Sequence, residues 1–254
     1  MEFKTVQVKK IVKLEGAPLI HLFLEGLDIN HRAGQFVMLR PRGWEFDPLW
    51  PRPFSICNQD KDGLHIFLQV VGRGTRRLAL LNKGDKIDCW GPIGNGFPID
   101  RREKVLILCG GMGIAPFVSF CTQHQNPQNI RLIFGHRLDL RVYPWNLIPS
   151  LVDKFAFRQE NEKDLKKFEK QIKQEIYNFK DIGKILVCGP RPFLKIVHKY
   201  AFEFKCADRV YLSLENRMAC GVGACLGCVA KTVNGYVQTC IKGPVFKATE
   251  LEEI

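Results

Sequence analysis

The chain contains the stretch Cys220-Gly221-Val222-Gly223-Ala224-Cys225-Leu226-Gly227-Cys228, with Cys240 further along. Cysteines spaced C-x4-C-x2-C with a distant fourth are the ligand pattern of plant-type [2Fe–2S] clusters. The glycines of this loop enter positive-φ conformations at little steric cost, so the backbone can fold tightly and turn its N–H groups towards the sulfur atoms. The stretch therefore predicts a metal centre formed by four thiolates.

A predicted hairpin returns the fourth cysteine to this loop. Ala230 to Thr232 and Tyr236 to Thr239 are β-rich runs that flank Asn234-Gly235, the dipeptide most typical of a tight hairpin turn. The second strand of such a hairpin leads directly into Cys240. We therefore expect Cys240 to lie beside the cysteine loop.

Other kinds of cysteine site fit this spacing less well. A structural zinc ribbon normally has two separated C-x2-C pairs, whereas this stretch has one, and a thioredoxin-like C-x-x-C needs a strand-to-helix context. A disulfide framework suits smaller chains. Zinc stays open as the alternative metal. The remaining cysteines lie in apolar segments, as reduced and buried thiols do: Cys57, Cys89, Cys109, Cys121, Cys188 and Cys206.

The composition is that of an ordinary globular protein. The 254 residues suffice for two domains and an appendage, and 46% of them are hydrophobic. Met1 to Val6 alternates like a strand and unlike a signal peptide, and no apolar run reaches membrane-spanning length. The formal net charge is +12, but Lys and Arg are interleaved with Asp and Glu. We therefore expect a soluble cytoplasmic protein that does not bind nucleic acid.

Residues 1–100 predict a small antiparallel β-barrel or β-sandwich. Short β-rich runs alternate with turn signals such as Gly16-Ala17-Pro18 and Ala33-Gly34. A loop rich in turn formers is expected over Gly91 to Phe97. The expected strands are Val6 to Leu14, Leu19 to Leu24, Gln35 to Leu39, Arg52 to Ile56, Leu64 to Val71 and Asp85 to Trp90.

Two segments of this barrel have the residues of a phosphate or heterocycle site. Proline in Arg52-Pro53-Phe54-Ser55 fixes φ, so Arg52 can hold phosphate oxygens and Ser55 can hydrogen-bond a heterocycle edge. Gly72-Arg73-Gly74-Thr75 precedes a predicted helix over Arg76 to Leu81, and a glycine turn that opens a helix presents free N–H groups to a pyrophosphate. A strand end and a tight connection are the plain alternatives.

From residue 101 the pattern changes to parallel α/β. Val105 to Cys109 is a continuous apolar run, typical of a strand buried on both faces, and Gly110 to Pro116 opens a helix that runs to Gln125. A strand, a glycine turn and a helix form a nucleotide-binding unit, although these glycines do not follow G-x-G-x-x-G. Further elements are expected over Ile130 to Phe134, Phe155 to Arg158, Asn161 to Phe179, Ile185 to Cys188, Pro192 to Phe204 and Val210 to Leu214.

The order of these motifs resembles the ferredoxin–NADP reductase superfamily along nearly the whole chain. Its flavin, flavin-phosphate and pyridine-nucleotide motifs match, in this order, Arg52-Pro53-Phe54-Ser55, Gly72-Arg73-Gly74-Thr75, Gly110 to Pro116 and Cys188-Gly189-Pro190. The resemblance implies FAD in an N-terminal antiparallel β-barrel, residues 1–100. It also implies NAD(H) on a Rossmann-like parallel α/β domain, residues 101–212.

The C-terminal segment, residues 213–254, is similar to a narrower group, the electron-transfer subunits of class 1B dihydroorotate dehydrogenases. The similarity runs from Glu215 through Cys228 and resumes over Lys242-Gly243-Pro244-Val245-Phe246. Related flavin and iron–sulfur subunits typically have an aspartate where Cys220 stands. The resemblance implies one [2Fe–2S] cluster, held by Cys220, Cys225, Cys228 and Cys240.

By position, the resemblance also assigns cofactor contacts to single residues. Arg52 would contact the flavin phosphates, and Ser55 the flavin ring near N5. The other cofactor-binding residues would be Pro53, Phe54, Leu68, Gln69 and Val70 for the flavin, Gly74 and Thr75 for its pyrophosphate, Gly110, Gly111 and Gly113 for the nucleotide, and Cys188 beside the nicotinamide. No residue is expected to act as a general acid or base.

The resemblance further implies a partner, the FMN-bearing catalytic subunit that oxidises dihydroorotate to orotate in pyrimidine synthesis. Electrons would leave dihydroorotate in that partner of a hetero-oligomer, pass singly through the cluster, collect on FAD and leave to NAD. Two alternatives stay open. The chain could serve another acceptor, such as sulfide, polysulfide or ferredoxin, or it could be a zinc-stabilised binding module without catalysis.

Two departures from the superfamily pattern fall on the nucleotide half. Family members often have a glycine-rich Asp-Gly-Ser type segment after the third strand of the α/β domain, whereas Phe155 to Lys163 runs directly into a charged helix. Arg191 follows Cys188-Gly189-Pro190, where a residue without positive charge is commoner. The preference for NAD over NADP is therefore open at the level of sequence.

Overall fold

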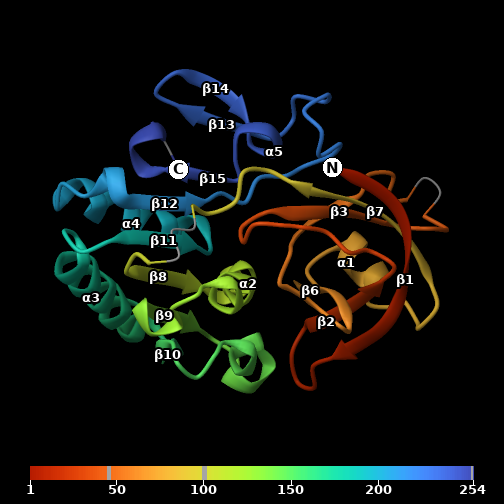
Figure 1. Cartoon of the computed structure of the whole chain (residues 1–254), viewed down its shortest axis with the longest axis horizontal. Coiled ribbons are helices and arrows are strands. Elements are labelled where there is room, and N and C mark those ends of the chain that lie inside the picture. Colours follow the sequence, from red (N-terminus) through yellow and green to blue (C-terminus); the bar gives the residue numbers. More distant parts are fainter. Residues whose placement is uncertain (45–46, 99–101, 253) are drawn as a thin grey trace.

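The computed structural model describes residues 1–44, 47–98, 102–252 and 254. Two sheets lie side by side: a curled antiparallel sheet formed by the N-terminal strands, and a sheet flanked by helices, with a small hairpin and the cysteine loop next to both (Figure 1). This arrangement confirms the expected fold class. The expected boundary between residues 100 and 101 lies outside the described residues.

The first sheet has seven strands in the order β4-β3-β7-β1-β2-β6-β5, and neighbouring strands are antiparallel. Side chains alternate between its faces, so Val6 and Val8 of β1 are both buried in the barrel core. A short helix, α1 (Arg73–Leu78), packs against this core through Leu78. The strands are β1 (Glu2–Lys13), β2 (Leu19–Glu25), β3 (Phe36–Pro41), β4 (Arg52–Ser55), β5 (Asn58–Asp60), β6 (Gly63–Gln69) and β7 (Lys86–Ile93).

The barrel differs from the expectation in several places. β1 begins at Glu2, and α1 begins at Arg73 inside the glycine turn. β5 was not expected, because its sequence Asn-Gln-Asp has no β-propensity and is held only by pairing with β6. The loop expected over Gly91 to Phe97 is wrong at its start, since β7 continues to Ile93 and pairs there with Phe36.

The second sheet has the order β10-β9-β8-β11-β12-β15, and its first five strands are parallel. Every residue of the central strand β8 is buried, as its unbroken apolar run predicted. The strands are β8 (Val105–Gly110), β9 (Ile130–His136), β10 (Asp153–Arg158), β11 (Lys184–Cys188), β12 (Val210–Ser213) and β15 (Val245–Lys247).

Helices cover both faces of this sheet. Helix α2 (Ala115–Gln123) shares a core with Ile107 and Cys109 of β8, whereas α3 (Glu162–Phe179) and α4 (Arg191–Glu203) share a core with the intervening Leu106 and Leu108. Asn161 caps α3 by accepting a hydrogen bond from the Asp164 N–H at 3.1 Å. A 3₁₀ turn over Gly111–Ile114 connects β8 to α2.

The C-terminal segment is more closely integrated than expected. The predicted hairpin is present as β13 (Val229–Thr232) and β14 (Gly235–Gln238), but Cys240 lies in a short helix, α5 (Thr239–Lys242), and not at a strand end. After α5 the chain returns to the α/β sheet, where β15 pairs antiparallel with β12. The cysteine segment is therefore connected to the α/β sheet on both sides, through β12 before Cys220 and through β15 after Cys240.

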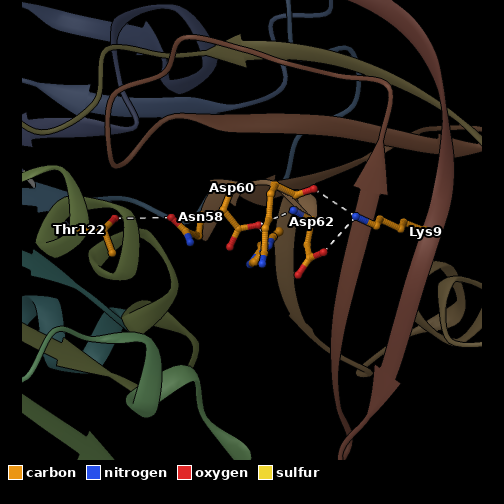
Figure 2. A network of polar contacts seen from close by, with 7 residues as sticks. Lys9, Asn58, Asp60, Asp62 and Thr122 are labelled. Atoms are coloured by element: carbon orange, nitrogen blue, oxygen red, sulfur yellow. Dashed lines mark hydrogen bonds and ion pairs between the residues drawn. The ribbon is translucent and has the colours of Figure 1, made fainter.

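Polar contacts join the two sheets' domains. The buried His31 Nε2 lies 2.8 Å from Ser119 Oγ of α2. Figure 2 shows the neighbouring contact, in which Thr122 Oγ1 of α2 donates to Asn58 Oδ1 of β5 at 3.5 Å. On the barrel side of β5, Lys9 Nζ pairs with Asp62 Oδ1 at 3.0 Å (Figure 2). The contacts of His31 with Ser119 and of Asn58 with Thr122 hold α2 against the edge of the barrel, whereas the Lys9–Asp62 pair lies within the barrel.

In the described part of the chain, no helix has the length and apolar character needed to cross a membrane.

Candidate functional site

A cavity of about 290 Å³ lies where the three parts of the chain meet. The barrel, the α/β sheet and the segment before the cysteine loop all contribute to its walls. The lining residues are Phe36, Pro53, Phe54, Ser55, Phe67, Leu68 and Gln69 of the barrel, Met112, Ala115, Cys188 and Ser213 of the α/β part, and Leu214, Glu215, Asn216, Met218 and Pro244 around the cysteine segment. We call this space the central cavity.

The flavin motif residues divide between this cavity and its neighbourhood. Pro53, Phe54 and Ser55 of β4 line it together with Leu68 and Gln69 of β6, and the sequence predicts a flavin contact for each of the five. Val70 is not a lining residue. It packs against the barrel core, and its N–H donates to the Pro18 carbonyl at 2.7 Å.

Arg52 and the glycine turn lie against each other. Arg52 Nη1 donates to the Trp50 carbonyl at 2.8 Å, and a Cβ atom at Gly74 would lie only 2.7 Å from Arg52 Nε. Thr75 Oγ1 accepts the N–H groups of Val71 and Gly72 at 2.9 and 3.0 Å, which fixes the turn. The guanidinium and the start of α1 thus form one positive surface, suited to phosphate.

A second cavity, of about 630 Å³, lies over the carboxyl ends of β8 and β9. It shares Gln69 and Met112 with the central cavity, so the two spaces adjoin. Its volume is in the range of cofactor pockets. Its other lining residues include Gly110, Gly111, Gly135, His136, Arg137, Leu138, Tyr143, Gln159, Lys166, Phe168, Glu169, Pro190 and Phe193.

Gly113 lies apart from this second cavity. A Cβ atom there would come within 2.2 Å of the Cys188 carbonyl oxygen, so glycine is needed for the 3₁₀ turn to cross the end of β11. Gly110 and Gly111 are cavity residues, whereas Gly113 is a packing residue. The glycines between Gly110 and Gly113 therefore have two roles, lining the cavity and packing against β11, which the sequence pattern alone does not distinguish.

Cys188 lies at the end of β11 and lines the central cavity. Its side chain is buried, and burial followed by the charge of Glu215 raises the pKa of the thiol far above its usual range. A thiol of this kind stays protonated at neutral pH and does not act as a nucleophile. Cys188 can contact a ligand only as a neutral group.

The first half of the cysteine loop wraps around one sulfur atom. Positive φ angles at Gly221, Gly223 and Leu226 turn the backbone inward, and the N–H groups of Val222 and Cys225 each approach Cys220 Sγ at 3.4 Å. Burial raises the pKa of Cys220, but these N–H groups outweigh burial and lower it to about 7. The loop therefore favours a thiolate at Cys220.

The second half of the site is buried. Cys228 and Cys240 pack with Phe36 and Met38 of β3 and with Ile93 of β7. Burial and the hydrogen-bonded Cys228 thiol raise the pKa of Cys240 to about 12. A metal binding at this position would displace the thiol proton.

The four cysteines fall into two groups, because the Cys225 N–H approaches Cys220 Sγ, whereas Cys228 and Cys240 are buried together beside β3. Within the described ranges, no three His, Cys, Asp or Glu side chains surround the position of a single metal ion. A [2Fe–2S] cluster takes two thiolates on each of its irons, so two pairs with inward N–H groups fit that group. The residues present therefore fit the cluster.

The barrel supports the cysteine loop directly. A Cβ atom at Gly221 would lie 2.6 Å from the Met38 side chain, so the loop touches β3, and Trp90 Nε1 donates to the Cys220 carbonyl at 3.4 Å. Asn216 Nδ2 donates to Thr239 Oγ1 at 2.7 Å and ties the entry of the loop to α5. The cysteines and the central cavity thus share one rigid support.

Several residues of the site were not expected. Met112, Glu215, Asn216, Met218 and Pro244 all line the central cavity. Glu215 to Met218 belong to the stretch that carries the family resemblance. The resemblance identified this segment but implied no role for these side chains. Met112 stands inside the run from Gly110 to Pro116, in which only the glycines are predicted to contact the nucleotide.

The chain is similar to known proteins in a family model, in full-length sequence and in fold. A family model described as the iron–sulfur cluster binding domain of dihydroorotate dehydrogenase B matches residues 215–252. The chain is 34% identical to the dihydroorotate dehydrogenase B (NAD(+)) electron transfer subunit of Clostridium acetobutylicum, over 98% of this chain and 97% of that protein. It is 33% identical to the subunit of the same name from Clostridium perfringens, over 99% of both chains.

Solved structures agree on the fold. A structure of NADH-dependent reduced ferredoxin-NADP oxidoreductase matches with a TM-score of 0.82 and 22% identity, over 98% of this chain and 90% of that one. The ferredoxin NADP+ reductase of Neisseria gonorrhoeae with bound FAD and NADP matches with a TM-score of 0.65 and 19% identity, over 84% of this chain and 98% of that one. Because the two Clostridium proteins are 34% and 33% identical to this chain over nearly its whole length, the chain belongs to the family of dihydroorotate dehydrogenase B (NAD+) electron transfer subunits.

Proposed function

We propose that this chain transfers electrons between a dihydroorotate-oxidising catalytic subunit and NAD+, by way of a [2Fe–2S] cluster and FAD. The observation that carries the proposal is the central cavity, whose walls join the flavin motif, the nucleotide motif and the segment leading into the four cysteines. The names of the Clostridium relatives support the same activity.

The flavin site is formed by the barrel, for which residues 1–100 are the proposed domain. Arg52, Gly74 and Thr75 would hold the phosphates at the start of α1, because the guanidinium and the turn already form one positive surface. Pro53 to Ser55, with Leu68 and Gln69, would enclose the flavin ring in the central cavity. Val70 would support this wall from behind.

The nucleotide site is formed by the second cavity, within a proposed domain of residues 101–212. Gly110 and Gly111 would admit the phosphates to the backbone at the end of β8. Cys188 would adjoin the nicotinamide as a neutral thiol, where the two cavities approach each other. Gly113 would keep the turn closed against β11.

The cluster site lies in the proposed domain of residues 213–254. Cys220, Cys225, Cys228 and Cys240 would bind the two irons, because the loop backbone turns its N–H groups towards Cys220 Sγ and Cys228 and Cys240 lie together beside it. When bound, FAD exchanges both single electrons and electron pairs, which links a one-electron cluster to a two-electron carrier. The protein's part is to hold both groups on adjoining walls and to exclude water from Cys228 and Cys240, which are buried.

A catalytic subunit with FMN is the proposed partner, in a hetero-oligomer. The cytoplasm is the proposed location, because all ten cysteines are free and most are buried, the usual state of thiols in a reducing compartment.

The proposal is tested by anaerobic co-expression with an FMN-type dihydroorotate dehydrogenase. We expect a stable complex that contains FAD and two irons per copy of this chain, with flavin and [2Fe–2S] absorption bands. A colourless, zinc-loaded protein would contradict the proposal. A coloured protein that reacts with ferredoxin or polysulfide but does not bind the dehydrogenase would show that the proposed partner is wrong and that the chain serves another acceptor.

A further inference from the structure

The second cavity carries more positive than negative charge on its walls. Among the described residues that line it, Arg137 and Lys166 are cationic, Glu169 is acidic, and the His136 ring is buried. Both cations are exposed to solvent and to the cavity. In the proposed function the diphosphate of the dinucleotide lies at Gly110 and Gly111, so these two cations are left for another anionic group of the ligand.

The fold brings the two cations to the same end of the cavity. Arg137 follows β9 directly, and Lys166 lies in the second turn of α3, the helix that follows the neighbouring parallel strand β10. A Cβ atom at Gly135 would lie 2.6 Å from the Phe168 ring, so the end of β9 packs directly against α3. The guanidinium and the ammonium group therefore stand on adjoining elements at the carboxyl ends of the strands.

Neither cation is neutralised by the part of the chain that the structure describes. No hydrogen bond or ion pair joins the side chain of Arg137 or Lys166 to another described residue. Glu169 lies one helical turn from Lys166, but its Oε1 accepts the Tyr200 hydroxyl at 2.7 Å instead. Both cations are thus available to a ligand.

An anion at this position distinguishes the two pyridine dinucleotides. In dinucleotide-binding α/β domains, an acidic residue about 20 residues after the glycine turn accepts a hydrogen bond from the ribose 2′-hydroxyl of NAD, whereas a nearby arginine accommodates the 2′-phosphate of NADP. No Asp or Glu occurs between Gly113 and Asp139, and both carboxylate oxygens of Asp139 accept hydrogen bonds from Arg141 at 2.9 Å. Arg137 stands in this region in place of an acid.

We propose that the second cavity accepts NADP(H) as well as NAD(H), and that Arg137 and Lys166 hold the 2′-phosphate of the adenosine ribose. The planar fork of the Arg137 guanidinium can donate two hydrogen bonds to one phosphate, and the Lys166 ammonium adds a second positive charge. The chemistry at the nicotinamide is the same for both dinucleotides, because the 2′-phosphate lies at the adenosine end. The inference rests on the proposed function, since it needs the dinucleotide in the second cavity.

The test compares two fragments that differ only in this phosphate, adenosine 5′-monophosphate and adenosine 2′,5′-bisphosphate. In calorimetric titrations of the FAD- and cluster-loaded complex, we expect the bisphosphate to bind about tenfold more tightly, the effect of one charge-assisted hydrogen bond. This ratio should fall in Arg137→Gln and in Lys166→Gln, and reach about one when both changes are combined. Lys170→Gln is the matched control and should keep the ratio, because Lys170 lies one turn further along α3 and does not line the cavity.

A second readout separates a charge contact from a change in the shape of the cavity. The ratio should shrink with rising salt in the wild type and in Lys170→Gln, because ions screen exposed charges, and should not depend on salt in the double variant. In turnover, the double variant should lose about tenfold in kcat/KM for NADP+ relative to kcat/KM for NAD+.

Two results would overturn the role of these cations: equal affinities of the wild type for the two fragments, or a tenfold ratio that survives in the double variant. Both results leave dihydroorotate-driven reduction of NAD+ intact. A wild-type complex that binds neither fragment and does not reduce NAD+ would instead overturn the proposed function.

Discussion

Single residues decide whether the cysteine site holds a cluster. Cys225 is exposed and hydrogen-bonds Cys220, so Cys225→Ser removes one thiolate of a pair without disturbing the buried core. We expect the variant to lose the iron–sulfur absorption and paramagnetic signals while FAD stays bound at wild-type content. Cys206→Ala, a buried cysteine outside the loop, should keep the cluster. A normal cluster in Cys225→Ser would show that the ligand set is wrong.

The phosphate surface depends on the absence of a side chain at position 74. In Gly74→Ala the new methyl group would lie 2.7 Å from Arg52 Nε and displace the guanidinium, which is the end of a flexible side chain. A lost charge-assisted hydrogen bond corresponds to about a tenfold weaker affinity for FAD, measured by fluorescence titration of the apoprotein. Gly72→Ala is the matched control, because a Cβ atom there meets open space. Equal FAD affinity in the two variants would contradict the role of Arg52.

A histidine of the barrel makes stability depend on pH. Desolvation, followed by the charges of His65 and Lys10, lowers the pKa of His21 from 6.5 to about 4. Between these values the unfolded chain binds a proton that the folded chain does not, so stability is lost as pH falls. The loss from this residue at pH 5 is about 2 kcal/mol. Urea unfolding of the cluster-free Cys225→Ser protein should show this loss in the free energy of unfolding as the pH is lowered to 5. The same protein with His21→Gln should lose about 2 kcal/mol less over that pH range.

At the scale of residues, the spacing of the cysteines predicts their role as cluster ligands, because ligand spacing follows directly from the chemistry of the cluster. Pro53, Phe54, Ser55, Leu68 and Gln69, which are predicted to contact the flavin, line one cavity. The packing role of Gly113 could not be distinguished from the roles of the neighbouring glycines, because it depends on the carbonyl of Cys188, which lies far along the chain. Glu215 gave no local signal either, because its environment comes from three separate segments.

At the scale of elements, long periodic segments were predictable and short, paired ones were not. Helix α3 follows its apolar stripe, and β8 follows its apolar run. β5 and β15 have three residues each and exist because a neighbouring strand pairs with them. The length and periodicity of a long element can be recognised in the sequence. A three-residue strand forms only because a neighbouring strand pairs with it in the folded protein.

The return of the C-terminal chain to the sheet depends on one asparagine. Asn95 Nδ2 donates to the Val245 carbonyl at 2.7 Å and to the Lys242 carbonyl at 3.1 Å, and Asn95 Oδ1 accepts the Val245 N–H at 3.2 Å. Asn95→Ala leaves these backbone groups without a partner, so we expect a loss of about 2 kcal/mol in the free energy of unfolding, measured by denaturant titration. Asn82→Ala, at an exposed turn of the barrel, should cost less. An equal loss in the two variants would contradict the anchoring role.

At the scale of the whole molecule, the architecture follows from the order of the motifs and their resemblance to a known superfamily. The relative placement of the two domains does not follow from local sequence. It is set by contacts such as His31 with Ser119, which join residues of opposite domains. The same placement brings the flavin motif, the nucleotide motif and the cysteine segment to one cavity, which is why function is decided at this scale.

In the proposed function, electrons from dihydroorotate reach NAD+ through this chain. The most direct measurement is anaerobic stopped-flow mixing of the reconstituted complex with dihydroorotate and NAD+, followed at the absorption bands of FAD, the cluster and NADH. We expect the cluster and FAD to be reduced before NADH appears, and no NADH to form in the Cys225→Ser complex. NADH formed at the wild-type rate in that complex, or a wild-type complex whose flavin and cluster stay oxidised, would contradict it.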